Sequence, residues 1–201
     1  DKEENDLPIV VMSSDTVTFP VDGEAALNQA PAKPEWQRWN DYGIGLLLKG
    51  NKGSEKGELI QAETAFKQVE ALGRADGPLN LARVYIKEGR LEKAVEALGR
   101  AVEADPPAPP WTVAWFNGVV NKQNGFLDEA IENFRGIVDD RSQEMIDRGF
   151  DFSQDYVALN ELGQTLFERS KMERANEAKR NEFLDRAIKR FEQALFYDSE
   201  N

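Results

Sequence analysis

The sequence predicts an all-α fold of about four helix-turn-helix units, preceded by a short extended or β-hairpin segment. Three observations support this prediction. From Trp36 onward, apolar residues recur at the three- and four-residue intervals of amphipathic helices. Glycine and proline residues separate these helical stretches. Finally, small, aromatic and apolar residues return in the same order several times along the chain, as expected for an internal repeat.

Residues 1–30 differ in character from the rest of the chain. The stretch 7–23, LPIVVMSSDTVTFPVDG, has β-branched and aromatic residues on both sides of a turn-like Ser-Ser-Asp cluster. This pattern is typical of a hairpin or of two extended pieces. Because an isolated hairpin is only marginally stable in water, we expect this segment to pack on the helices or on another part of the polypeptide. A proline-containing linker then leads into the helical region, residues 31–201.

The clearest helical unit lies within residues 79–106. Residues 81–88 carry one apolar helical stripe, and residues 91–103 carry a second one. Gly89 separates the two helices. Asp105–Pro106 ends the second, because proline lacks the amide donor and restrains the residue before it. The predicted unit is therefore helix, tight turn, helix and stop.

The same register returns in the other units. Counted from Ala82, marker residues fall at offsets of 3, 7, 12, 16, 19 and 24, and the same offsets apply from Gly118. A copy that begins near Trp39 fits with a turn longer by 7 residues, which is polar and glycine-rich. A copy that begins near Leu162 has 12 extra residues, whose strong helix formers should lengthen the helices. The predicted units are residues 36–74, 75–108, 111–144 and 156–201.

These marker residues resemble the tetratricopeptide repeat (TPR) family. Its units of about 34 residues carry a small residue, an aromatic or Leu, Gly, Ala, a second aromatic or Leu, Ala and Pro in this order. The resemblance implies a right-handed superhelical array in which neighbouring hairpins bury a continuous core. It also implies that the first helix of each unit lines a concave face.

The end of the sequence, FEQALFYDSEN, resembles a second helix followed by the turn to a further unit. A finished array normally ends in a polar capping helix. Here Phe191, Leu195, Phe196 and Tyr197 would lack a cover. We therefore expect this chain to be a fragment of a longer protein that continues with more repeats.

The composition excludes several classes of function. The 201 residues include no cysteine and no histidine, so disulfides, thiolate or imidazole metal sites and Ser-His or Cys-His nucleophile pairs are absent. The net charge of −12 repels phosphate backbones, which argues against nucleic-acid binding. No apolar run approaches the ~20 residues of a membrane span. We predict a protein that is not an enzyme and needs no cofactor or metal.

Three short motifs invite a chemical interpretation, but each is better explained structurally. The stretch 49–57, KGNKGSEKG, lacks the residue order of a phosphate-binding loop and follows a helix rather than a strand. Asp147, Asp151 and Asp155 lack the spacing of a calcium-binding loop and are predicted to be solvated loop acids. The stretch 105–111, DPPAPPW, is predicted to be a helix stop and spacer rather than a polyproline ligand.

The candidate binding residues are those that the repeat register places on the concave face. They are mostly apolar residues and amides, with two cations, Arg83 and Lys122, in an otherwise acidic protein. Tryptophan and arginine are the residue types that most often anchor interfaces. The alternative role for each residue is packing against a neighbouring helix or the N-terminal segment. The twelve positions are Asn40, Ile44, Leu47, Leu79, Arg83, Ile86, Trp115, Val119, Lys122, Asn160, Gln164 and Phe167.

One known binding mode of the family is not predicted. Some members hold a C-terminal peptide carboxylate with Lys and Asn at set places on the concave face. The corresponding places in the first unit are Asn40 and Ile44. The carboxylate clamp of those members is therefore absent from this chain.

The functional prediction is a non-catalytic scaffold that binds a partner protein or peptide, or another domain of the same full-length chain, in the concave groove. The alternative is an accessory or assembly module of a larger enzyme or electron-transfer protein whose chemistry lies outside this sequence. A third hypothesis places residues 1–30 in the groove as an internal ligand. The sequence does not determine the cellular compartment. The start at Asp1 favours an exported, periplasmic location over a cytoplasmic one, although trimming explains it equally.

Overall fold

The computed structural model describes residues 32–50, 56–140 and 143–198. All regular structure in these ranges is helical, which confirms the all-α class. The hairpin predicted for residues 1–30 and most of the glycine-rich turn after the first helix lie outside the described residues. The helices are α1 (Glu35–Gly50), α2 (Lys56–Ala71), α3 (Asp76–Lys87), α4 (Leu91–Glu103), α5 (Pro110–Gln123), α6 (Leu127–Asp139), α7 (Gln143–Asp147), α8 (Tyr156–Ser170) and α9 (Glu177–Tyr197), with a 3-10 turn, η1 (Phe152–Gln154), before α8.

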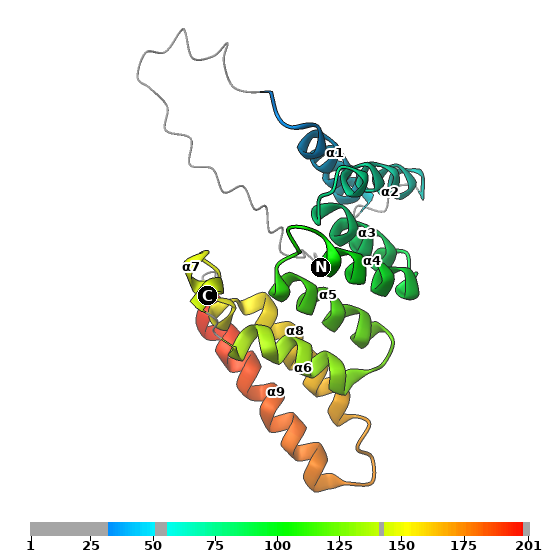
Figure 1. The fold of residues 1–201 in the computed structure, drawn as a ribbon. Coiled ribbons are helices and arrows are strands. Elements are labelled where there is room, and N and C mark those ends of the chain that lie inside the picture. The colour runs from blue at the N-terminus through cyan, green and yellow to red at the C-terminus, as the bar shows by residue number, and fades with distance from the viewer. Residues whose placement is uncertain (1–31, 51–55, 141–142, 199–201) are drawn as a thin grey trace.

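Consecutive helices pack as pairs, and the pairs pack on one another in chain order. The pairs are α1 with α2, α3 with α4, α5 with α6, and α8 with α9. Between pairs, α2 packs on α3, α4 on α5 and α6 on α8. Figure 1 shows the succession from α1 and α2 at the top to α8 and α9 at the bottom. This is the arrangement of a helical repeat array.

The turn inside a pair depends on glycine at two equivalent places. Gly89, after α3, has a φ of 70°, and Gly125, after α5, has a φ of 81°. Residues other than glycine rarely adopt this left-handed conformation. It allows the amide of the residue after the glycine to donate a hydrogen bond back to a carbonyl of the first helix. The Arg90 amide accordingly donates to the Tyr85 carbonyl at 2.8 Å, and the Phe126 amide donates to the Asn121 carbonyl at 2.8 Å. The second helix can therefore begin at once and return along the first.

Inside three of the pairs, a glycine lets the two helices approach closely. An ideal Cβ placed on Gly118 would lie 2.5 Å from the ring of Phe134. The corresponding distance is 2.6 Å between Gly43 and Phe66, and 2.7 Å between Gly163 and Phe191. These distances are shorter than real non-bonded carbon–carbon contacts, so any larger residue at these places would require the phenylalanine ring or the helices to shift.

The pair formed by α3 and α4 solves the same packing problem with different residues. Ala82 stands where the other pairs have glycine, and Leu98 stands where they have phenylalanine. Both side chains are buried in one apolar cluster, with exposed fractions of 0% and 2%. A larger residue on the first helix is thus accompanied by a smaller one on the second, which conserves volume where the helices cross.

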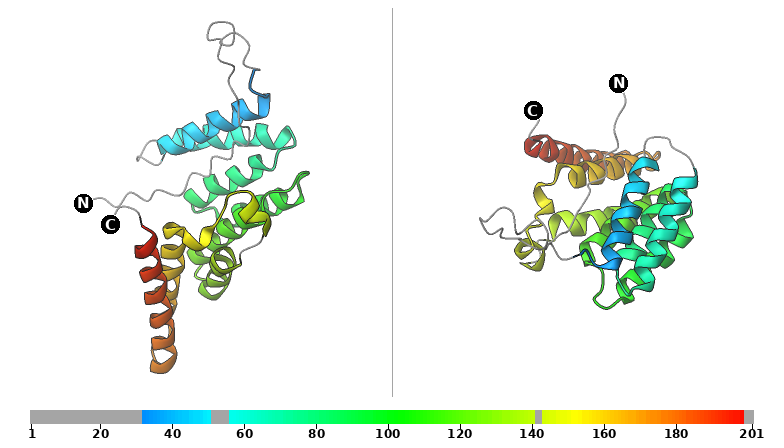
Figure 2. Two further views of the ribbon diagram at one scale, coloured as in Figure 1. Left: turned by 90° about the vertical axis from the view of Figure 1, so that its left-hand side faces the viewer. Right: turned by 90° about the horizontal axis from the view of Figure 1, so that it is seen from above.

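An insertion separates α6 from α8 and changes the direction of the last pair. It contains α7 and η1, and η1 packs against α6, α8 and α9. Phe150 and Phe152 stack on each other at 5.8 Å, and Phe150 also contacts the ring of Trp111 at 5.9 Å. Figure 2 shows that α8 and α9 run steeply across the direction of the first helices. The last pair therefore does not simply continue the direction of the earlier ones.

The two ends of the last pair agree with the sequence-based expectation for its extra residues. Helix α9 is 21 residues long, and only residues 171–176 form the turn before it, so much of the added sequence is helical. At the other end, Leu195 is 62% exposed and Phe196 is 81% exposed, as predicted for uncovered side chains. Phe191 differs from that prediction, because it is half-buried against Gly163.

Gly118→Ala should destabilise the protein by about 1–3 kcal/mol, because the buried Phe134 ring cannot move away from the new methyl group. Adding Phe134→Leu, which copies the Ala82 and Leu98 combination, should recover part of that loss. Urea unfolding followed by circular dichroism measures both changes.

The matched control for this experiment is Gly99→Ala in α4, where an added Cβ meets no atom within 4 Å. It should stabilise the protein by about 0.5–1 kcal/mol, since alanine is the better helix former. If Gly118→Ala behaves like Gly99→Ala, the close approach of α5 and α6 does not limit the residue at position 118.

Candidate functional site

All twelve candidate binding residues lie on the first helices of the four pairs. Asn40, Ile44 and Leu47 are on α1; Leu79, Arg83 and Ile86 are on α3; Trp115, Val119 and Lys122 are on α5; Asn160, Gln164 and Phe167 are on α8. Because α3 packs on both α1 and α5, the first three of these helices form one continuous row. Whether this row binds a partner depends on which side chains remain available.

The polar candidates on α1 and α3 are connected by a residue that the sequence analysis missed. The Asn80 side chain donates from Nδ2 to Asn40 Oδ1 at 2.8 Å, and its Oδ1 accepts a hydrogen bond from Arg83 Nη1 at 3.2 Å. Asn80 is only 8% exposed. In the sequence, Asn80 is a polar residue inside an otherwise apolar stripe. A polar side chain that is buried in this way needs a hydrogen-bond partner. The amide chain joins α1 to α3 and holds Arg83 in place.

The apolar candidates on α1 and α3 contribute mainly to packing. Leu47 is buried, with 4% exposed, and Ile44, Leu79 and Ile86 pack partly buried against the same apolar cluster. These side chains stabilise the junction between the first two pairs. Only their outer edges are left for a ligand.

The α5 candidates join the third pair to the last one. The Trp115 ring lies 5.3 Å from the Phe134 ring and packs against the cluster that contains Leu159. Lys122 Nζ lies 2.8 Å from Glu161 Oε1 and 3.6 Å from Glu168 Oε1, and both carboxylates belong to α8. Trp115 is therefore a packing residue, and the charge of Lys122 is compensated within the chain.

The α8 candidates are the most accessible of the set. Phe167 is 43% exposed, and Lys171 Nζ lies 4.1 Å above its ring. Gln164 is exposed one turn earlier, and Asn160 is half-buried. An exposed aromatic ring beside an exposed amide can anchor a partner through both apolar contact and hydrogen bonding.

Arg83 is the candidate with the most unusual electrostatics. Burial lowers the pKa of its guanidinium, and no carboxylate within the described ranges lies close enough to form an ion pair with it. Lys87 follows one turn later on α3, and burial together with the charge of Arg83 lowers the pKa of Lys87. Two basic side chains therefore lie one turn apart on α3.

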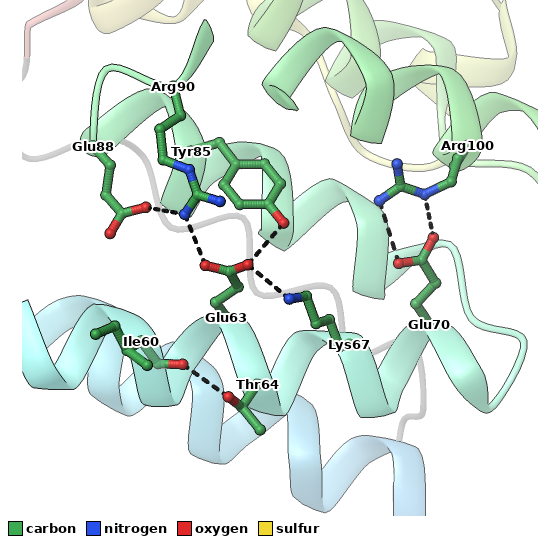
Figure 3. A network of polar contacts seen from close by, with 9 residues as sticks. All are labelled: Ile60, Glu63, Thr64, Lys67, Glu70, Tyr85, Glu88, Arg90 and Arg100. Carbon is green, nitrogen blue, oxygen red and sulfur yellow. Dashed lines mark hydrogen bonds and ion pairs between the residues drawn. The ribbon is translucent and has the colours of Figure 1, made fainter. Parts of the chain in front are cut away.

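A second polar cluster, centred on Glu63 of α2, connects the first two pairs (Figure 3). Glu63 accepts hydrogen bonds from Tyr85 Oη at 3.1 Å and from Arg90 Nη1 at 2.9 Å, and Lys67 Nζ lies 2.8 Å away. Burial acts to raise the pKa of Glu63, but the hydrogen bonds from Lys67, Arg90 and Tyr85 outweigh it and lower the pKa to about 2 from 4.5. The same Arg90 Nη1 also binds Glu88 at 2.7 Å.

This cluster has the properties of a structural brace rather than of a catalytic site. The Glu63 carboxylate is held ionised by three donors, so it is a poor proton acceptor at neutral pH. Burial and the adjacent Glu63 charge raise the pKa of Tyr85, which keeps its hydroxyl protonated. The cluster ties α2 to α3 and to the turn before α4.

Other kinds of site find little support in the described residues. These residues contain no group of three acidic side chains arranged to hold a metal ion. Asp151 and Asp155 instead cap η1 and α8, where they accept hydrogen bonds from the amides of Ser153 and Ala158. None of the described helices is both long enough and apolar enough to span a membrane.

A shallow cavity of about 350 Å³ lies between the turn before α6 and the turn before α9. Phe126 and Met172 line it, together with Arg169. The guanidinium of Arg169 binds Asp128 at 2.7 Å and Glu173 at 2.8 Å, so these three charged groups of the cavity are paired with one another. None of the predicted binding residues takes part in it.

Comparison with protein families identifies one matching segment. Residues 55–113, from the region of α2 to the beginning of α5, match the family model described as tetratricopeptide repeat. No curated protein and no solved structure matched the chain.

Trp115→Ala should lower the free energy of unfolding by about 2–4 kcal/mol, because the ring fills space between α5, α6 and α8. Phe167→Ala, on the exposed side of α8, should cost about 1 kcal/mol or less. Chemical denaturation measures both values, and equal losses would contradict the packing role of Trp115.

Glu63→Gln should reduce stability at pH 6 by about 1–3 kcal/mol, because Arg90 and Tyr85 lose a charged acceptor. A folded-state pKa below the unfolded value gives stability that is complete above about pH 5 and is lost as pH falls toward 2. The difference between wild type and Glu63→Gln should therefore shrink between pH 5 and pH 2 in urea titrations. Glu92→Gln, at an exposed position of α4, is the control and should show no such trend.

Proposed function

Because residues 55–113 match the tetratricopeptide repeat family, we propose that the chain is a non-catalytic protein–protein interaction module. The observation that carries the proposal is the family match at residues 55–113, because repeats of this family generally mediate protein binding. The proposed units are residues 36–74, 75–108, 111–144 and 156–201, arranged as a right-handed superhelix. The proposed partner is a protein or peptide segment bound along the row of first helices.

The residues along this row differ in whether they are packed and paired within the chain or available to a partner. The apolar residues on α1, α3 and α5 pack against neighbouring helices, and Lys122 is paired with Glu161. Gln164 and Phe167 on α8 are exposed, and Arg83 on α3 is half-buried without a carboxylate partner in the described ranges. We therefore assign partner recognition to these three residues rather than to all twelve. The remaining nine are assigned mainly to the scaffold that positions these three, with only the outer edges of Leu79 and Ile86 left to contact a partner.

A second candidate is an accessory module of a larger enzyme or electron-transfer protein. The end of α9 favours contact with a further domain, because Ile188, Leu195 and Phe196 expose apolar surface there, at 52%, 62% and 81%. The full-length gene sequence separates the two candidates: a catalytic or haem-binding region in the same polypeptide supports the second.

The binding proposal predicts that Phe167→Ser and Gln164→Arg each weaken capture of a specific partner by about fivefold or more, because both replacements alter exposed groups on α8. The measurement is affinity capture on immobilised chain, with quantitative mass spectrometry of the retained proteins. Circular dichroism checks that each variant is folded.

Val95→Ser on α4 is the matched control, since Val95 is a comparably exposed apolar residue, at 51%, on a second helix. It should leave capture unchanged. Equal retention of every partner by wild type, Phe167→Ser and Gln164→Arg would overturn the assignment of binding to this row.

A further inference from the structure

Arg83 differs from the other half-buried arginines of the described part of the chain. Each of the others lies within 4.0 Å of a carboxylate, whereas no carboxylate in the described ranges lies within that distance of Arg83. Its one hydrogen bond to a described residue goes from Nη1 to the neutral Asn80 Oδ1. The paired, half-buried arginines are Arg74, Arg90, Arg169, Arg180, Arg186 and Arg190.

The environment makes this missing counter-charge costly. Burial lowers the pKa of the Arg83 guanidinium, yet an arginine side chain stays charged in a protein. A partly buried, uncompensated cation opposes folding, and proteins usually compensate it with a carboxylate. The sequence contains 37 Asp and Glu residues, yet none of those in the described ranges lies within ion-pair distance of Arg83.

Within the described ranges, the surroundings of Arg83 hold its guanidinium in place without neutralising it. The hydrogen-bonded chain from Asn40 through Asn80 fixes Nη1, and this leaves the other guanidinium donors without a described partner. A guanidinium held in this way can bind both oxygens of a carboxylate. On the same helix, Leu79 lies four residues before Arg83 and Ile86 three residues after it, so apolar surface flanks the charge on both sides.

We propose that Arg83 binds an aspartate or glutamate side chain that stands between apolar residues in an extended segment of the partner protein. This inference rests on the proposed function and specifies the chemistry of its partner. Leu79 and Ile86 take up the apolar neighbours of that acidic residue. A single acidic residue fits better than a polyacidic tract, because the overall charge of −12 repels a strongly acidic partner.

The test uses the full chain and needs no knowledge of the partner. Arg83→Met keeps an unbranched apolar side chain and removes the charge, so it should melt at a higher temperature than wild type. Glutarate, a small dicarboxylate, is the probe and is compared with chloride at equal ionic strength. It should raise the melting temperature of wild type by about 2–4 °C more than that of Arg83→Met. Arg135→Met is the control, because Arg135 is exposed on α6 and paired with Glu132, and it should respond to glutarate as wild type does.

Two results would overturn the proposal. One is a lower melting temperature for Arg83→Met, which would make Arg83 a structural residue. The other is an equal response of wild type and Arg83→Met to glutarate. Either result would remove Arg83 from the recognition residues, but neither overturns the binding function itself, whose own test uses Phe167 and Gln164. A partner that is lost with Phe167→Ser but retained by Arg83→Met would leave the binding function standing and reject the carboxylate contact.

Discussion

The close approach of paired helices at a single small residue is the constraint on which the rest of this structure depends. Where Gly43, Gly118 and Gly163 face a phenylalanine ring, any larger residue would have to displace the ring or push the two helices apart. The separation within a pair sets where its outer faces lie, and those faces pack on the next pair. An error at one crossing would therefore displace every later helix. The Ala82 and Leu98 combination shows that total volume at the crossing, rather than glycine itself, is what the array requires.

The sequence was sufficient to predict the helical class and the family resemblance, because both depend on local signals. Helical spacing of apolar residues, turn glycines at positions 89 and 125 and the proline after α4 act within a few residues of each other. The insertion between α6 and α8 was harder to predict. Its short helix and stacked Phe150 and Phe152 rings depend on contacts with Trp111, which is distant in sequence. No local pattern indicated the steep course of α8 and α9 that follows this insertion.

For the candidate site too, some features could be predicted from local sequence signals, and others depend on tertiary contacts. The repeat register correctly indicated which helices carry the twelve residues, but it could not indicate which of them are consumed by packing. Lys122 looked like an available cation in the sequence, and Glu161 and Glu168 on α8 compensate it. Asn80 was missed because it lies beside the positions that the register assigns to the concave face. It was the one polar residue in a buried stripe, and that feature could have identified it.

Stability and recognition compete in a repeat array because one helix face must serve both. A first helix that packs perfectly against its neighbours has nothing left to bind a partner, and a helix with many unsatisfied groups does not pack. In this chain, the energetic cost of leaving a group available for a partner falls mainly on one residue, Arg83. Within the described ranges, the other half-buried arginines are paired, the Glu63 carboxylate has three partners, and Arg83 alone among the half-buried arginines has no carboxylate within 4.0 Å. Residues that oppose folding persist where function requires them, so this cation is a stronger indication of recognition than the exposed apolar residues around it.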